Sequence, residues 1–298
     1  MVNEGRAFAE LTRALDARGQ DPRNLAPIGV RPPLGEYVRQ LWERRHFIWY
    51  DSRQRAATQE SRSKLGNAWL LLRPMLDAAF YWLIFGVLIG ADRGVENFPA
   101  FIVIGILMYR STASAITSGT GSMRAGRAMI RAFSFPRASI PISNVLQSAL
   151  TAVVTTAAMC VAIILIPPHA LPQATWPLII PIFVLHMAMN LGITFITARI
   201  GFHLPDVSNI MSVLSRILMY TSGVIFPIEM FIKDPTVAFL ITLNPLYRVI
   251  DMARTVLIDG DVPGLDSWLI LSAWVIVLAG GGFLYFWRGE EIYGRELR

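Results

Sequence analysis

Six long apolar stretches are the feature that most restricts what this sequence can fold into. They cover residues 68–91, 98–118, 140–166, 176–200, 207–227 and 268–287. A helix needs about 20 mostly apolar residues to cross a hydrocarbon core, where every backbone N–H and C=O must be paired within the segment. Each stretch meets that requirement. The sequence therefore predicts an all-α integral membrane protein with six transmembrane helices.

The composition excludes the main soluble classes. Only 16% of the residues are charged and 54% are hydrophobic, whereas roughly 25% are charged in a typical soluble domain. Such a chain is too apolar to be disordered, and a single cysteine, Cys160, cannot support a disulfide scaffold.

The positions of the basic residues predict the orientation in the membrane. If both termini are cytoplasmic, 20 of the 27 Lys and Arg residues lie on the inner side, as cytoplasmic flanks require. The net charge of +6 is then chiefly a topology signal, and no nucleic acid is needed to explain it. Twelve basic residues precede the first apolar run, which argues against a signal peptide. We expect a multi-pass protein of the plasma (inner) membrane.

The remaining segments complete the expected layout. Residues 1–33 form a cytoplasmic tail, 34–67 an amphipathic interface helix with a Leu-Gly loop, 68–288 the six-span domain, and 289–298 a second cytoplasmic tail. Aromatic residues such as Tyr37 and Trp42 suit the headgroup depth of the inner leaflet. The same pattern would also fit a soluble helix packed on a partner. Prolines and charges interrupt residues 230–250, which we interpret as re-entrant or interfacial gate helices.

The sequence carries no motif for its own chemistry. Neither lysine, Lys64 or Lys233, follows a glycine, so the chain has no P-loop and is not predicted to be an enzyme. The four histidines are scattered without metal-ligand spacing, so we predict no metal site, no catalytic residue and no cofactor in this chain. Any ATP and Mg²⁺ would be bound by a partner ATPase.

Few charges fall within the spans. Asp77 lies four residues after Arg73, on the same helix face, and the two could neutralise each other. Arg110 and Arg216 have no acid three or four residues away on their own helices. An intramembrane arginine is a candidate for a polar path or an anionic group, although snorkelling or structural pairing is the alternative.

Several motifs in order resemble those of ABC-2 type permeases that export polysaccharides. Residues 62–74 read RSKLGNAWLLLRP, residues 135–141 read FPRASIP, and SGVIFP at 222–227 precedes LNPL at 243–246. The resemblance covers about residues 34–288 and is to the Wzm/TagG group, which exports O-antigen, teichoic acid or actinobacterial cell-wall galactan precursors. The chain departs from the group at Arg110, where an apolar or aromatic residue is expected, and at His203, where many relatives have Arg.

This resemblance implies a channel subunit that works as a homodimer with two copies of a cytosolic ABC ATPase. The implied substrate is a polysaccharide linked to a polyprenyl diphosphate lipid. The loop that would admit the lipid head at the inner leaflet contains Arg62, Lys64, Leu65, Gly66, Trp69 and Arg73. The basic loop 119–139 would couple to the ATPase through Arg124, Arg127, Arg131, Ser134, Phe135 and Pro136, although positive-inside retention alone also explains its charge.

Two further sets of residues would form the path of the substrate. Aromatic faces stack on sugars, and an intramembrane arginine can face a polar path. We therefore expect the channel to be lined by Tyr81, Trp82, Phe85, Tyr109, Arg110 and Arg216. The region 228–266 resembles an external gate, for which the candidate residues are Phe226, Pro227, Asn244 and Pro245.

Three other functions compete with this interpretation. An ABC-2 exporter of drugs or small lipids would have the same fold with a different lumen. A membrane enzyme acting on polyprenyl lipids would need a cluster of Asp, Glu and His at one membrane face, and the sequence has no such cluster. A secondary transporter would need paired intramembrane acids and an inverted repeat, and the sequence shows neither.

Overall fold

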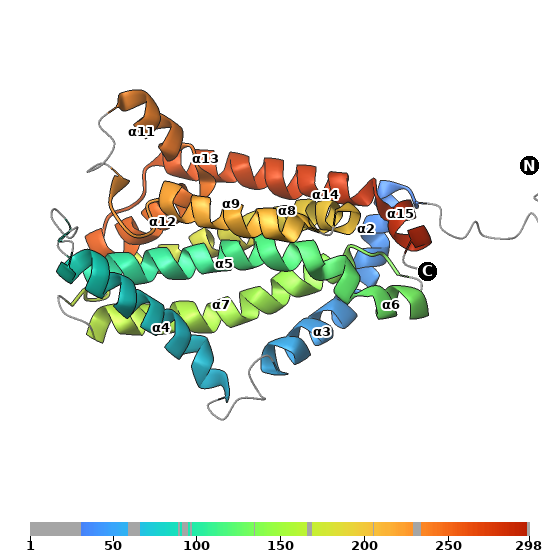
Figure 1. Ribbon diagram of the computed structural model, residues 1–298, viewed down its shortest axis with the longest axis horizontal. Helices are drawn as coiled ribbons and strands as arrows, with labels where there is room; N and C mark the ends of the chain where they lie inside the picture. Colours follow the sequence, from blue (N-terminus) through green and yellow to red (C-terminus); the bar gives the residue numbers. More distant parts are fainter. Residues whose placement is uncertain are drawn as a thin grey trace, which may run out of the picture.

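The computed structural model describes residues 31–58, 66–88, 90, 95, 97–133, 135–165, 169–204, 206–228 and 234–296. These residues form helices joined by short connections, and no strand occurs among them (Figure 1). Helices α2 and α15 lie at one end of the bundle, close to α6, and we call this the α6 end. The opposite end carries α11 and α12, and we call it the α11 end.

Helix α5 (Phe98–Ala125) is the centre of the bundle. It starts where the Asn97 side chain accepts a hydrogen bond from Ala100 N at 3.1 Å, with Pro99 in the first turn. Most of its first two turns are buried. Helices α7 (Ser139–Leu165), α8 (Ile179–His203) and α9 (Val207–Thr221) pack around it. A 3-10 turn, η4 (Trp176–Leu178), leads into α8.

The last long helix packs against α8 at two glycines. It consists of α13 (Leu265–Val275), the π-helical η6 (Ile276–Gly280) and α14 (Gly281–Trp287). A Cβ at Gly192 would collide with the backbone of Leu278, and one at Gly282 would lie 2.6 Å from Gly192 O. Close helix approach through small residues is typical of membrane bundles, which lack a hydrophobic force between helices.

Within the described part of the chain, four helices are long and apolar enough to cross a membrane: Phe98–Arg131, Ser139–Leu165, Trp176–His203 and Leu265–Trp287. The first expected span is instead α4 (Trp69–Tyr81), which follows the 3-10 turn η2 (Gly66–Ala68) and continues as the π-helical η3 (Trp82–Leu88). The fifth, expected over 207–227, is helical only as α9, because Gly223 has a φ of 62° and ends the helix. Six spans therefore remain a prediction.

The expected interface helix is two helices, α2 (Leu34–Glu43) and α3 (Arg45–Thr58). Helix α3 packs on α7, where Ser52 Oγ donates to Ser143 O at 3.0 Å. Trp42 is exposed, as a residue at headgroup depth would be, but Tyr37 is fully buried. The expectation for Tyr37 was wrong because its hydroxyl is bonded inside the protein.

The basic loop is more helical than expected. Helix α5 continues to Ala125, so the first part of the predicted loop 119–139 extends the helix. Gly126 then separates it from the short helix α6 (Arg127–Ala132). The extension is held by close packing, since a Cβ at Gly119 would collide with the Thr197 hydroxyl of α8.

The segment expected to form the gate is broken into short helices. These are α11 (Pro235–Thr242) and α12 (Pro245–Arg254), and the π-helical η5 (Thr255–Asp259) continues α12. Asp234 and Asn244 cap the two helices, and a proline follows each cap. At the other end of the molecule the chain finishes in α15 (Glu290–Glu296).

Candidate substrate cavity and coupling surface

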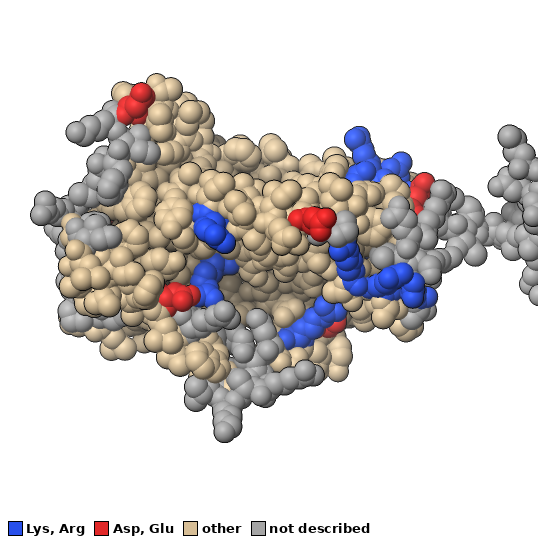
Figure 2. All heavy atoms as spheres, in the orientation of Figure 1, with Lys and Arg blue, Asp and Glu red and all other residues tan. Residues whose placement is uncertain are grey.

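A cavity of about 870 Å³ opens beside α5, within the range of about 300–1,000 Å³ that ligand pockets occupy. Its wall comes from α5, α7, α8 and α9, together with Trp69 at the start of α4. Figure 2 shows this face hollowed, with basic side chains beside the hollow and a second group at the α6 end.

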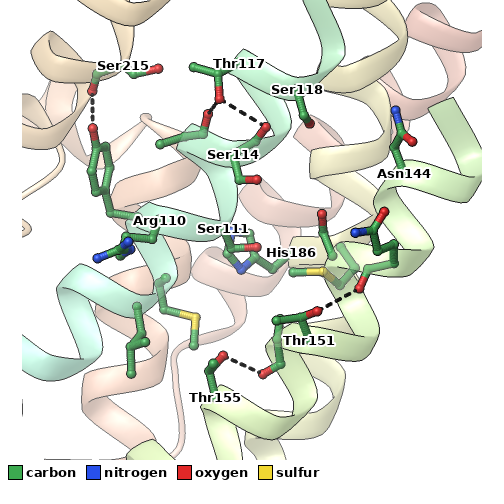
Figure 3. A pocket seen from close by; sticks show the side chains of 18 of the residues that line it. Arg110, Ser111, Ser114, Thr117, Ser118, Asn144, Thr151, Thr155, His186 and Ser215 are labelled. Carbon is green, nitrogen blue, oxygen red and sulfur yellow. Dashed lines mark hydrogen bonds between the residues drawn. The ribbon is translucent and has the colours of Figure 1, made fainter. Parts of the chain in front are cut away.

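Hydroxyl and amide side chains dominate the polar part of the wall. Figure 3 labels several of them: Ser111, Ser114, Thr117 and Ser118 on α5, Asn144, Thr151 and Thr155 on α7, and Ser215 on α9. The members are Ser111, Ser114, Thr117, Ser118, Ser122, Asn144, Gln147, Ser148, Thr151, Thr155, Thr156, Ser212 and Ser215. Arg110 is the only acidic or basic side chain, apart from His186, among the described residues that line the cavity. The wall can therefore exchange hydrogen bonds with many small polar groups.

The predicted channel residues divide into two groups. Tyr109 and Arg110 line the cavity, and Tyr109 donates to Ser215 O at 3.0 Å, which ties α5 to α9. The other four are not part of this wall. Tyr81 and Phe85 pack with their ring centroids 6.3 Å apart, Trp82 is 41% exposed, and Arg216 is exposed on α9.

The acid in the first span pairs with a different arginine from the expected one. Asp77 of α4 forms an ion pair with Arg110 of α5, and both side chains are partly exposed. The side chain of Arg73 lies outside the described residues, so the predicted pairing of Asp77 with Arg73 stays a prediction, and helix spacing along α4 said nothing about the neighbouring helix. Arg110 is accordingly a paired arginine that links two helices at the edge of the cavity.

A buried polar network behind the cavity was missed from the sequence. Thr112 Oγ1 donates to Asn190 Oδ1 at 3.0 Å and lies 2.8 Å from His186 Nε2. The hydroxyl has one proton, which it gives to Asn190, so Nε2 of His186 must be the donor. Nδ1 is then a bare acceptor, and it has no hydrogen-bond partner among the described residues. Nothing in the spacing of the histidines indicated that His186 would meet Thr112.

The access loop is described only in part. Arg62, Lys64 and Leu65 lie outside the described residues, as does the side chain of Arg73. Gly66 has a φ of 51°, a left-handed conformation that favours glycine, and open space surrounds its Cβ position. This fits the expected turn into the first span. Trp69, three residues later, lines the cavity.

At the α6 end, the exposed residues are not all those predicted. Arg124, Arg127 and Arg131 are exposed, whereas Ser134 lies outside the described residues. Phe135 and Pro136 are buried, and Phe135 is part of a cluster with Ile130 and Ile140. Phe133 instead is 65% exposed. We call the exposed residues Arg127, Arg131 and Phe133 the coupling surface.

A buried acid lies directly behind this surface. Glu290, the first residue of α15, accepts hydrogen bonds from Arg137 N at 2.9 Å and from the Tyr37 hydroxyl at 2.7 Å. Burial raises the pKa of Glu290, and the hydrogen bonds that Arg137 and Tyr37 donate to it oppose this shift. Burial and the neighbouring Glu290 raise the pKa of Tyr37 well above its usual range, so this hydroxyl keeps its proton.

At the α11 end, the cap of α12 contacts the turn that precedes Phe226 and Pro227. Asn244 Oδ1 accepts from Leu246 N at 3.0 Å, and its Nδ2 donates to Ser222 Oγ at 2.9 Å. The capping residue of α12 is thereby bonded to the turn that ends α9. Phe226 and Pro227 follow that turn, and Phe226 packs partly buried against the core.

A buried arginine fixes the same turn from the other side. Arg254, in the predicted external region 228–266, is only 8% exposed. It donates to Gly223 O at 2.7 Å, Val224 O at 2.9 Å and Phe101 O at 2.9 Å, and its guanidinium lies over the Phe101 ring. The sequence carries no signal that would distinguish this arginine from its neighbour Arg248.

Among the described residues, no group of three or more His, Cys, Asp or Glu side chains is arranged to hold a metal ion. The long apolar helices around a hydroxyl-lined cavity define a polytopic membrane protein of the transport class. The family model of the ABC-2 type transporter matches residues 53–258, the larger part of the sequence. The chain belongs to the ABC-2 type transporter family.

Curated relatives match over most of their length. The O-antigen export system permease protein RfbA of Myxococcus xanthus is 22% identical over 265 residues, which cover 87% of this chain and 98% of that relative. A protein of the same name from Klebsiella pneumoniae is 24% identical, covering 66% of this chain and 74% of the relative. The polysialic acid transport protein KpsM of Escherichia coli is 22% identical, covering 78% and 90%.

Proposed function

We propose that this chain is the channel subunit of an ABC exporter that moves a polysaccharide linked to a polyprenyl diphosphate lipid across the plasma membrane. Cell-wall galactan and O-antigen are the polymers that the motif resemblance favours. Polymer export is supported by the relatives, which are an O-antigen export system permease protein and a polysialic acid transport protein. The lipid-linked substrate comes from the resemblance of the motifs.

The observation that carries the proposal is the composition of the cavity wall. Hydroxyl and amide groups line it, and Arg110 supplies the charge. Each hydrogen bond to such a wall replaces one to water, and its net worth is only about 0.5–1.5 kcal/mol. A sugar chain would therefore be accepted without being held tightly, as movement through a channel requires. An exporter of apolar drugs would be served better by an apolar wall.

The coupling surface suggests how an ATPase would drive the channel. Phe133 presents an exposed aromatic side chain beside Arg127 and Arg131. An aromatic anchor flanked by arginines is typical of residues that dominate protein interfaces. We propose that two copies of a cytosolic ABC ATPase, which bind ATP and Mg²⁺, dock here on a homodimer of this chain. Both termini would be cytoplasmic, in agreement with the distribution of basic residues.

Blocking the cavity tests the transport function. Thr151 on α7 lines the cavity, while Val154 on the same helix is 50% exposed and is not part of the cavity wall. We expect Thr151→Trp to stop export, with lipid-linked glycans accumulating on the inner side of the membrane. The matched variant Val154→Trp adds the same side chain outside the cavity and is expected to export normally.

The measurement is the pool of lipid-linked glycans in cells whose only copy of the gene encodes each variant, compared with cells depleted of the protein. Immunoblots of the membrane fraction establish equal amounts of the two variants. Unchanged glycan pools after depletion would defeat the proposal. Normal export by Thr151→Trp at a normal membrane level would show that this cavity is not the path.

A further inference from the structure

Glu290 joins three parts of the chain that lie far apart in the sequence. Its side chain is only 1% exposed, and both carboxylate oxygens accept hydrogen bonds. Oε1 accepts from the backbone N of Arg137 at 2.9 Å and from its Nη1 at 3.1 Å. Oε2 accepts from the Tyr37 hydroxyl at 2.7 Å. The acid therefore binds the end of the basic loop and the N-terminal helix α2 at once.

The Tyr37 hydroxyl completes the junction. It donates to Glu290 and accepts from the backbone N of Ala138 at 3.0 Å. Arg137 and Ala138 immediately precede α7, so their N–H groups are among those that a helix start leaves unpaired. A carboxylate and a hydroxyl from distant parts of the chain thus serve as the cap of α7, and negative charge at this position is favourable.

Additional contacts hold α2 to the last long helix. Trp287 Nε1 donates to Pro32 O at 3.2 Å, and the guanidinium of Arg31 lies 4.0 Å from the centre of the Trp287 ring. Trp287 is the last residue of α14, three residues before Glu290. Movement of the start of α7 therefore cannot be separated from movement of α2 and α14 without breaking buried hydrogen bonds.

The junction lies directly next to the coupling surface. Arg137 follows Phe133 by four residues, and Phe135 between them is buried in the same cluster as Tyr37 and Tyr293. On the other side of α6, a Cβ at Gly126 would lie 2.5 Å from the Ile140 side chain of α7. A force applied to α6 is thus transmitted into the first turn of α7 from both sides.

We propose that Glu290 is a positioning residue that makes α2, the start of α7 and the last long helix move together with the coupling surface. The inference rests on the proposed function, because it takes α6 as the point where the ATPase acts. Glu290 does not contact the ATPase or the substrate in this scheme. Its role is to convert a local displacement of α6 into a displacement of α7, which lines the cavity, together with α2 and the last long helix.

The test compares Glu290→Gln with Glu291→Gln in the complete exporter. Gln keeps the shape of the side chain but removes the charge and turns one acceptor into a donor. Glu291 is the adjacent acid, is partly exposed, and accepts a hydrogen bond from Arg31 N at 3.2 Å. Three quantities are measured: co-purification of the ATPase, ATP hydrolysis by the purified complex, and export of the cell's own lipid-linked glycans.

We expect Glu290→Gln to bind the ATPase and hydrolyse ATP at nearly the wild-type rate. Export per ATP should fall by about tenfold, within the range of 0.5–2 kcal/mol that coupling positions produce. Glu291→Gln should match the wild type in all three. Normal export by Glu290→Gln overturns the inference. So does a loss in which ATPase binding, hydrolysis and export fall together, because that pattern indicates a merely structural role.

Tyr37→Phe keeps the inference testable if Glu290→Gln does not accumulate in the membrane. It leaves the Arg137 contacts of Glu290 in place and removes only the link to α2 and Ala138. A selective fall in export per ATP supports the inference, and unchanged export overturns it. Failure of the wild-type chain to bind any ATPase is a distinct result, which would refute the proposed function instead.

Discussion

Each end of the molecule is built around one buried charge, but the two charges have opposite signs and different partners. At the α6 end, Glu290 is 1% exposed and is bound by donors from Tyr37 and Arg137. At the α11 end, Arg254 is 8% exposed and donates to carbonyls of Phe101, Gly223 and Val224. Both charges are satisfied, as buried charges must be.

The difference lies in what each charge can do after folding. An arginine stays protonated at any physiological pH, and backbone carbonyls cannot move away from it without refolding the turn. A carboxyl group titrates, and Glu290 is held partly by side chains that have other rotamers. We infer that Arg254 makes the α11 end a fixed frame, whereas the junction around Glu290 can adjust.

The largest expected effect is therefore the loss of Arg254. Arg254→Met keeps the apolar volume but leaves three buried carbonyls without this donor, so we expect a loss of about 3–5 kcal/mol in the free energy of unfolding. The exposed Arg216 on α9 gives the matched control, because Arg216→Met should change stability by less than about 0.5 kcal/mol. Unfolding of the detergent-solubilised protein by denaturant measures both.

The intermediate variant Arg254→Lys tests whether charge alone is enough. A single ammonium group cannot reach three carbonyls in the planar arrangement that the guanidinium uses. We expect stability between the wild type and Arg254→Met. Equal stability of all three proteins would remove the contrast between the two ends, because the α11 end would then not depend on this arginine.

Removal of the Tyr37 hydroxyl should have the next largest effect. Tyr37→Phe leaves Ala138 N–H and one oxygen of Glu290 buried with a partner missing, which costs about 1–3 kcal/mol. Tyr293→Phe is the control, since Tyr293 belongs to the same buried cluster and its hydroxyl makes, within the described part of the chain, a single long hydrogen bond, 3.3 Å to Phe286 O. We expect its cost to stay below about 1 kcal/mol. Similar losses in the two variants would mean that the junction is ordinary packing.

A smaller effect is expected from pH, because donors on Arg137 and Tyr37 partly offset the burial of Glu290. Burial raises the pKa of Glu290 above its ordinary value of 4.5, so the folded protein holds this proton more tightly than the unfolded chain. The resulting stabilisation is complete below the ordinary pKa and is lost as the pH rises through the raised pKa.

The measurement is the difference in melting temperature between the wild type and Glu290→Gln across this pH range. The wild type should gain relative to the variant as the pH falls, and the advantage should shrink as the pH rises. Gln does not titrate, so the difference isolates Glu290 from all other acids. A difference that stays constant with pH would contradict the assignment of a titrating junction at the α6 end.

The general layout could be predicted from the sequence, whereas the two buried charges could not. Apolar length predicted the long helices at Phe98–Arg131, Ser139–Leu165, Trp176–His203 and Leu265–Trp287, because membrane spanning depends on local composition. Their ends agree to within a few residues, except that the first of these helices continues well past the predicted end at residue 118. A Leu-Gly loop was predicted before the first span, and Gly66 in this loop has a left-handed φ of 51°. Glu290 pairs with Tyr37 across 253 residues, and no local pattern encodes such a contact.

Local reasoning also failed where neighbouring helices decide. Helix spacing along α4 could not indicate the ion pair that Asp77 forms with Arg110 of α5. The motif around residues 135–141 drew attention to Phe135, which is buried, and away from Phe133, which is exposed. In both cases the residue type was informative and its environment was set by packing between helices.

The smallest expected effect comes from the third charged contact, between Asp77 and Arg110. Its side chains are 45% and 35% exposed at the edge of the cavity, so water and ions screen the attraction. We expect Asp77→Asn to change the free energy of unfolding by about 0–1 kcal/mol. The same denaturant titration that is used for Arg254→Met measures it, and Arg110→Gln should give a similarly small value. A loss as large as that of Arg254→Met would mean that charge itself stabilises this fold. A small loss would show that the large effects at the two ends come from burial. A charge that water can reach keeps most of its solvation when its partner is removed.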